Sequence, residues 1–276
     1  MNRDGYVSLI GAGPGDPELL TLKGLRRLQQ ADVIVYDALI RPEMLAYAHP
    51  DAELIKAGKR GGEISATQAW INHLLVTKAQ AGLSVVRLKG GDPFIFGRGG
   101  EEAEVLAAAG IAWEVIPGIT SAIAAPAYAG IPVTHREYAS SVVFITGHED
   151  PQRLETRINW HALAHGIDTL VFLMGVSRLA HITSQLITHG RPSDTPVAAV
   201  RWGSTSEQKT VTGTLATIVE AVKQAELHAP AVLVVGEVVR LRDQLNWFES
   251  IPIDLPRSHG DGELEKSKAE NMKHKA

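Results

Sequence analysis

Glycines and charged residues crowd together in the run GGDPFIFGRGGEE, which covers residues 90–102. Glycine lets a ligand approach the backbone closely, and the N–H groups exposed there can hold a carboxylate or a ribose hydroxyl. Arg98 stands between glycines in this run, and its planar guanidinium is well shaped to pair with a carboxylate. These residue types predict a local binding site for an anionic ligand.

Similar clusters occur at other points of the chain, and each follows a short apolar run. In the first half they are 11–16 (GAGPGD), Asp37, 58–60 (GKR) and 117–118, and in the second half 146–148, 174–175 and 201–203. A single glycine cluster is usually a turn. Their recurrence at the ends of consecutive candidate strands instead favours one shared ligand site.

The elements that must position these clusters alternate along the first half of the chain. The candidate strands are 6–10, 33–36, 53–57, 85–88 and 113–116, and the candidate helices are 22–30, 42–48, 67–80, 100–109 and 120–129. This order predicts βαβ crossovers and a mainly parallel sheet. Because ligands bind beyond the carboxyl ends of parallel strands, the clusters should meet at one edge.

A second α/β series follows the polar segment THREYASS at residues 134–141. Its candidate strands are 142–146, 169–173, 196–200 and 231–235, with helices near 177–189 and 215–224, and 208–214 could add an antiparallel strand. We therefore predict two α/β domains: 1–135 with a mainly parallel sheet and 142–250 with a mixed sheet, joined by a linker at 136–141. The active site should lie in the cleft between them, and 251–276 should form a disordered tail.

Composition excludes several classes of protein. Of the 276 residues, 45% are hydrophobic and 21% charged, which suits a globular core, and no cysteine is present for disulfides or thiolate zinc sites. With 27 basic and 31 acidic residues, the net charge of -4 has the wrong sign for general nucleic acid binding. No apolar stretch is typical of a signal peptide or a membrane span. We expect a cytoplasmic protein with neither nucleic acid nor membrane as partner.

Three familiar kinds of site are poorly matched. The glycines at 11, 13 and 15 suggest a dinucleotide fold, but Asp16 occupies the position where helix packing requires the third glycine. His161 and His165 have the spacing of metal ligands on a helix, yet no carboxylate completes the set nearby. No Gly-x-Ser-x-Gly elbow supports serine hydrolase chemistry.

Four motifs carry a resemblance to a known family. They are VSLIGAGPGDPELLTLKG (7–24), VYDALI (35–40), KGGDPFIFGRGGEE (89–102) and PGITS (117–121). In this order and at this spacing the chain resembles the tetrapyrrole methylases over about residues 5–250. The third motif, with Arg98, Glu101 and Glu102, is most similar to that of the uroporphyrinogen-III C-methyltransferases.

The resemblance implies an activity, a cofactor and partners. S-adenosylmethionine would methylate C-2 and then C-7 of uroporphyrinogen III, giving precorrin-2 through precorrin-1 for sirohaem, cobalamin or haem d1. S-adenosylhomocysteine would be the second product, no metal would take part, and the enzyme would be a homodimer.

The same resemblance implies roles for individual residues. The residues matching donor contacts are Pro14, Gly90, Gly91, Asp92, Ile95, Thr120, Ser121, Met174, Gly203 and Ala231. The catalytic candidates are Asp37 and Lys59, as acid and base, with Arg98 and Glu101. Arg98 and Glu101 also match residues on the substrate side, as do Arg41, Arg136 and His148.

The implied chemistry leaves one role open. Methyl transfer from a sulfonium is an in-line displacement, in which orientation supplies on the order of 7 to 11 kcal/mol. A proton must later leave the ring system, and a positioned base could accept it. A guanidinium hardly deprotonates, so Arg98 is assigned to substrate binding and the acceptor stays open. The alternatives are a sister precorrin methylase, a diphthine-forming methylase, or a binding module without chemistry.

Overall fold

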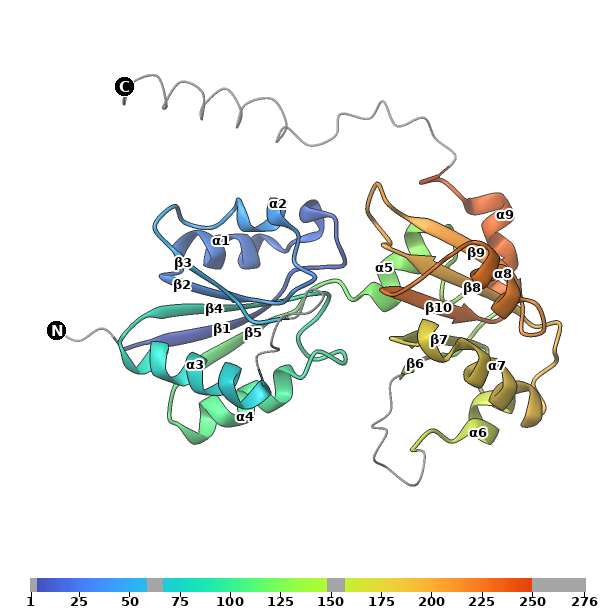
Figure 1. Ribbon diagram of the computed structural model, residues 1–276, viewed down its shortest axis with the longest axis horizontal. Coiled ribbons are helices and arrows are strands. Elements are labelled where there is room, and N and C mark those ends of the chain that lie inside the picture. Colours follow the sequence, from blue (N-terminus) through green and yellow to red (C-terminus); the bar gives the residue numbers. More distant parts are fainter. Residues whose placement is uncertain (1–3, 59–66, 148–156, 250–276) are drawn as a thin grey trace, which may run out of the picture.

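Two five-stranded sheets, each covered by helices on both faces, make up the chain (Figure 1). The computed structural model describes residues 4–58, 67–147 and 157–249. The tail predicted for 251–276 lies outside these ranges. Two α/β units were predicted from the sequence, and this fold class is confirmed.

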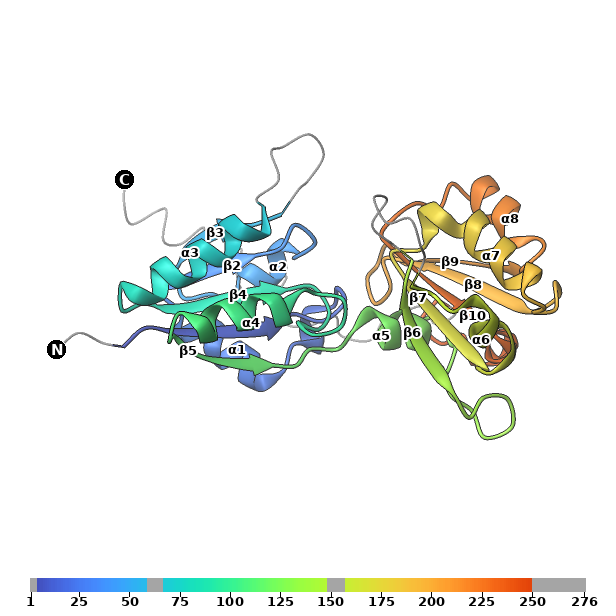
Figure 2. The same ribbon diagram turned by 90° about the horizontal axis from the view of Figure 1, so that it is seen from below.

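The first sheet is entirely parallel. Its strands are β1 (Tyr6–Gly11), β2 (Val33–Tyr36), β3 (Glu53–Lys56), β4 (Ser84–Lys89) and β5 (Ala112–Ile116), in the order β3-β2-β4-β1-β5. The three central strands β1, β2 and β4 are buried along nearly their whole length, as expected of a parallel sheet, whereas the edge strands β3 and β5 are partly exposed. All five carboxyl ends point toward the second domain (Figure 2).

Helices cover both faces of this sheet. They are α1 (Leu22–Gln30) and α2 (Pro42–Leu45) on one face, and α3 (Gln68–Gln80) and α4 (Gly99–Ala108) on the other. Leu28 and Met44 pack with one core, whereas Leu75 and Leu106 pack with the other. The helix predicted at 42–48 ends at Leu45, because the next residues continue as tighter i to i+3 turns.

The second sheet is mixed, as predicted. Its strands are β6 (Val142–Thr146), β7 (Thr169–Leu173), β8 (Pro196–Arg201), β9 (Lys209–Thr214) and β10 (Ala231–Val235), in the order β6-β7-β10-β8-β9. Only β6 and β7 pair in parallel, while β10 and β9 run antiparallel to their neighbours. The antiparallel strand expected near 208–214 is therefore confirmed as β9.

Helices again lie on both faces. One face carries α6 (Trp160–His165), α7 (Leu179–Thr188) and α8 (Ile218–Gln224), and the other face carries α5 (Ser121–Tyr128). The remaining elements of the chain are α9 (Arg242–Leu245) and the 3-10 helices η1 (Pro17–Leu19), η2 (Val176–Arg178) and η3 (Glu237–Leu241). None of the helices in the described ranges has the length and apolar content that a membrane crossing needs.

Helix α5 belongs by packing to the second domain. Its Ala122 and Ala125 are buried against Val171 of β7 and Val234 of β10. The chain therefore crosses between the sheets just before α5, earlier than the linker predicted at 136–141. The sequence pattern placed α5 with the first sheet only because it follows β5 directly.

Glu114 of β5 ties α1 to the edge of the first sheet. Its carboxylate accepts hydrogen bonds from Arg27 Nε at 2.6 Å and from Ser8 Oγ at 3.2 Å, and Lys23 Nζ lies 2.5 Å away. Partial burial acts to raise the pKa of Glu114, but the bonds from Arg27 and Lys23 outweigh it and bring the pKa down to about 2.

This low pKa makes the contribution of Glu114 to stability depend on pH. A carboxyl whose folded pKa is depressed stabilises the fold above its unfolded pKa of about 4.3 and loses that effect as pH falls toward the folded value. Urea unfolding should therefore show Glu114→Gln to be least stable relative to the wild type at pH 7, with the difference shrinking between about pH 4.5 and 2. The exposed Glu104→Gln is the control, and a difference for Glu114→Gln that stays constant over this range would contradict the assignment.

Candidate active site

The carboxyl ends of the first sheet open into a cleft of about 750 Å³ that the second domain closes from the other side. The loops after β1, β2 and β4 line it on one side, and the loops after β7 and β8 and before β10 line it on the other. The glycine clusters predicted to share one site are thus brought together at one edge. Most come from strands that are neighbours in the first sheet.

Backbone contacts between three glycine loops form one wall of the cleft. Gly13 and Gly91 exchange two backbone hydrogen bonds, with N to O distances of 3.2 and 2.7 Å. A Cβ on Gly118 would lie 2.2 Å from the Gly91 carbonyl oxygen, so only glycine permits this approach. Asp92 locks the arrangement, because its carboxylate accepts from Gly118 N at 3.0 Å and from Phe94 N at 2.8 Å.

Two hydrogen bonds and an ion pair link the two domains beside the cleft. Asp16 N donates to Ser204 Oγ at 3.3 Å, and Tyr128 donates its hydroxyl to Asp16 at 3.1 Å. Arg41 Nη1 lies 3.3 Å from the Glu207 carboxylate across the gap. Burial, with the nearby Asp16 carboxylate, raises the pKa of Tyr128 to about 12, so its hydroxyl keeps its proton.

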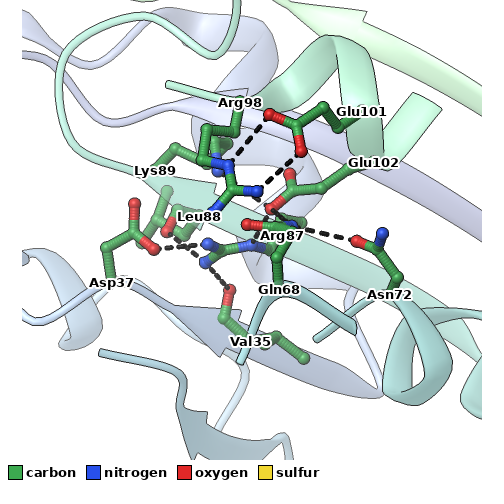
Figure 3. Close-up of polar contacts among 10 residues, drawn as sticks. All are labelled: Val35, Asp37, Gln68, Asn72, Arg87, Leu88, Lys89, Arg98, Glu101 and Glu102. Atoms are coloured by element: carbon green, nitrogen blue, oxygen red, sulfur yellow. Dashed lines mark hydrogen bonds and ion pairs between the residues drawn. The ribbon is translucent and has the colours of Figure 1, made fainter. Parts of the chain in front are cut away.

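Charged side chains form the floor (Figure 3). Arg87 and Lys89 project from the end of β4, and Glu102 of α4 accepts hydrogen bonds from both at 3.0 Å. Arg87 also donates to Asp37, the residue that follows β2. Arg87 and Lys89 are each 2% exposed and Glu102 0%, so these charges are nearly removed from bulk water.

The surroundings of the two floor cations shift their pKa values in opposite directions. Burial acts to lower the pKa of Arg87, but the carboxylates of Asp37 and Glu102 outweigh it and raise this pKa. Burial and the neighbouring Arg87 guanidinium lower the pKa of Lys89 despite the pull of Asp37 and Glu102. Arg87 therefore stays cationic, while Lys89 loses its proton more easily than a lysine in water.

Arg98 lies at the mouth of the cleft, where α4 begins. Its backbone is left-handed, with φ of 59°, and its guanidinium forms two bonds to Glu101 at 2.9 and 2.7 Å. The bonds to Glu101 raise the pKa of Arg98, and they lower the pKa of Glu101. Both side chains are more than half exposed, so this pair is open to exchange with another carboxylate.

Most of the residues predicted for the site lie together. The cleft is lined by Pro14, Asp37, Arg41, Gly90, Gly91, Asp92, Ile95, Arg98, Thr120, Ser121, Met174, Gly203 and Ala231. Glu101 stands behind Arg98 rather than on the lining. Lys59 and His148 lie outside the described residues.

Arg136 is placed away from this cleft. It is not among the residues that line the cleft, and it lies in the exposed turn closed by the bridge between His135 and Ala139. The placement of this arginine in the single chain therefore does not match the predicted substrate contact. The rings of His161 and His165 are 4.7 Å apart, with no third candidate metal ligand beside them in the described residues.

Sequence reasoning missed the floor of the cleft. The prediction of site residues did not include Arg87, Lys89, Glu102 or Gln68. Gln68 belongs to this group because its Nε2 donates to Glu102 at 3.2 Å. One signal was present: Arg87 stands inside the apolar run of a strand expected to be buried. A buried arginine requires hydrogen-bond acceptors, but the sequence does not reveal which residues supply them.

The family described as Tetrapyrrole (Corrin/Porphyrin) Methylases matches residues 6–219, and the chain belongs to it. The resemblance found in the four motifs is thereby confirmed.

Two relatives within this family are more than half identical to the chain in sequence. The chain is 54% identical over 235 residues to the uroporphyrinogen-III C-methyltransferase of Priestia megaterium, covering 85% of this chain and 98% of that protein. It is also 54% identical over 248 residues to siroheme synthase 1 of Yersinia pseudotuberculosis, covering 90% of this chain. That match spans only 52% of the synthase, so about half of that protein has no counterpart in it.

A solved structure agrees in fold and sequence. The uroporphyrin-III C-methyltransferase of Thermus thermophilus, complexed with S-adenosyl homocysteine, superimposes with a TM-score of 0.74 at 40% identity. The match covers 86% of this chain and all of that one. The two-domain methyltransferase architecture is therefore shared over nearly the whole described chain.

Proposed function

We propose that the chain transfers methyl groups from S-adenosylmethionine to C-2 and then C-7 of uroporphyrinogen III, giving precorrin-2 through precorrin-1. The observation that carries this proposal is the cleft itself, which is lined by both glycine loops and paired charges at the carboxyl ends of β1, β2 and β4. Support also comes from the 54% identity to a relative of that name along 98% of its length.

The glycine wall is suited to the methyl donor. A Cβ at Gly90 would meet no atom within 4 Å, so the backbone there is open to a ligand. Thr120 begins α5 as its N-cap and Ser121 is its first residue, which adds polar groups beside Gly91. In this proposal Pro14, Asp92 and Ile95 complete the donor site of the first domain. The second domain contributes Met174, Gly203 and Ala231.

The mouth is suited to a substrate with many carboxylates. Arg98 and Arg41 are both held by exposed glutamates, Glu101 and Glu207, which substrate carboxylates can replace without leaving either arginine unpaired. Both arginines border the cleft that also holds the donor wall. Binding at these two arginines therefore holds the macrocycle at the cleft that contains the donor wall.

Catalysis in this account is mainly a matter of alignment. The pyrrole carbon attacks the methyl group in line with the departing sulfur, forming a carbon–carbon bond as the carbon–sulfur bond breaks, and S-adenosylhomocysteine leaves. A ring proton is then lost to a base. Asp37 borders the cleft with its carboxylate held by Arg87, and it remains, with Lys59, the acid–base candidate.

Two further expectations remain predictions. A homodimer is consistent with the large apolar side chains of Phe94 and Ile123, which are 54% and 47% exposed. The second is a cytoplasmic location, which is expected from composition.

Anaerobic incubation with S-adenosylmethionine and uroporphyrinogen III tests the activity directly. Two methyl groups should be added to each macrocycle over many turnovers, because one cleft serves both carbons, and mass spectrometry with precorrin-2 absorbance follows them. Arg98→Ala should abolish turnover while S-adenosylhomocysteine still binds, since the arginine stands on the substrate side. Methylation of a later precorrin but not of uroporphyrinogen III, or normal turnover by Arg98→Ala, would contradict the proposal.

A methyl group added at Gly90 tests the donor site. Gly90→Ala should fold normally, since its Cβ meets nothing, but should weaken S-adenosylhomocysteine binding by about tenfold or more, ~1.4 kcal/mol, by filling ligand space. Gly100→Ala on α4 is the matched control, because its Cβ also meets nothing and the residue is not on the lining. Calorimetric titration measures both, and equal affinities in the two variants would remove Gly90 from the donor site.

A further inference from the structure

Glu102 is a buried carboxylate that the activity proposed above does not use. Its side chain has no exposed area and does not line the cleft. Its Oε1 nevertheless accepts hydrogen bonds from three side chains that do line it: Arg87 Nε and Lys89 Nζ at 3.0 Å, and Gln68 Nε2 at 3.2 Å. Glu102 therefore connects α4 to the floor from behind.

Among the described residues that form the floor, the charges balance only when Glu102 is counted. Arg87 and Lys89 supply two positive charges, and Asp37 and Glu102 supply two negative ones. The charged groups nearest to this set on α4 are Arg98 and Glu101, which neutralise each other, while α3 presents the uncharged Gln68 and Asn72. Removing the Glu102 charge would leave one excess positive charge directly under the cleft.

The arrangement also fixes geometry. Arg87 is held from both ends, with Nε on Glu102 and Nη2 on Asp37, and Nη1 donates to the Val35 carbonyl at 3.3 Å. The guanidinium therefore has one orientation, and the Asp37 carboxylate is held with it. The side chains of Arg87, Lys89 and Gln68 all donate to the same oxygen of Glu102, Oε1. The other oxygen, Oε2, has no hydrogen-bond partner in the described part of the chain.

Stability alone is a weak reason for this design. Buried ion pairs lose much of their Coulombic gain to desolvation, and apolar replacements of similar volume are often as stable. If the cluster lay far from the cleft, nothing would suggest a role for it beyond structure. This one ends at Asp37, on the lining of the cleft.

We propose that Glu102 is a positioning residue of the active site: it holds Arg87 against Asp37 and balances the charge of Lys89, so that the cleft floor carries paired charges in one geometry. This inference rests on the proposed function, because its main readout is methyl transfer. Glu102 itself contacts neither donor nor substrate.

A series of variants that changes the charge of the floor tests the proposal. Glu102→Gln leaves an excess positive charge, which favours deprotonation of any group that titrates in the cleft, so the pH profile of kcat should move about one unit toward lower pH. Lys89→Met leaves an excess negative charge and should move the profile toward higher pH. The double variant restores the balance, and its profile should return to the wild-type position.

Glu102→Gln should also lower kcat about tenfold, because an uncharged amide holds Arg87 less firmly, while S-adenosylhomocysteine affinity stays within about twofold. The matched control is Glu104→Gln, an exposed glutamate on the same helix, which should change neither quantity. Donor binding and near-ultraviolet circular dichroism report whether each variant is folded. If Glu102→Gln does not fold, the opposite shift in Lys89→Met still tests the charge balance.

The outcomes separate this inference from the function on which it rests. A wild-type chain that binds the donor but methylates no tetrapyrrole contradicts the proposed function. With an active wild type, profiles that coincide in all the variants, or a double variant displaced as far as Glu102→Gln, would overturn the positioning role and leave Glu102 as a structural residue.

Discussion

The close approach of three backbone segments at the carboxyl edge of the first sheet is the constraint on which the rest of the site depends. The loops after β1, β4 and β5 meet where a Cβ on Gly118 would lie 2.2 Å from the Gly91 carbonyl oxygen. Parallel strands deliver all these loops to one edge, and glycine lets them touch. The wall that results is made of backbone, so it presents fixed N–H and C=O groups rather than mobile side chains.

The floor answers a different physical problem. β4 brings two cations into a sheet that helices cover on both faces, and unpaired charge there would be costly. Glu102 from α4 and Asp37 from the β2 loop supply the opposite charges. Packing of α4 on the sheet thereby helps to fix the position of the Asp37 carboxylate on the cleft lining. Arg98 and Glu101 form an exposed, exchangeable pair, whereas Arg87, Lys89 and Glu102 of the floor are buried.

Periodicity and the strand-end clusters predicted the architecture because apolar runs separated by helical stretches allow few topologies. The antiparallel β9 follows from that pattern, and the glycine loops on the cleft lining follow from the strand-end clusters and the motifs. The six-residue α6 was missed because so short a helix has little periodic signal. α5 was assigned to the wrong sheet, since packing partners far apart in sequence decide it. Glu102 could not be paired with Arg87 for the same reason.

The central claim is that the donor binds against the glycine wall at the carboxyl edge, and a crystal structure of the chain with S-adenosylhomocysteine tests it most directly. The account predicts the ligand in contact with residues 90–92 and 120–121, with Met174 and Gly203 on its other side. Binding elsewhere, for example in the polar depression at the amino ends of the strands beside Asp32, His49 and Ser84, would contradict it.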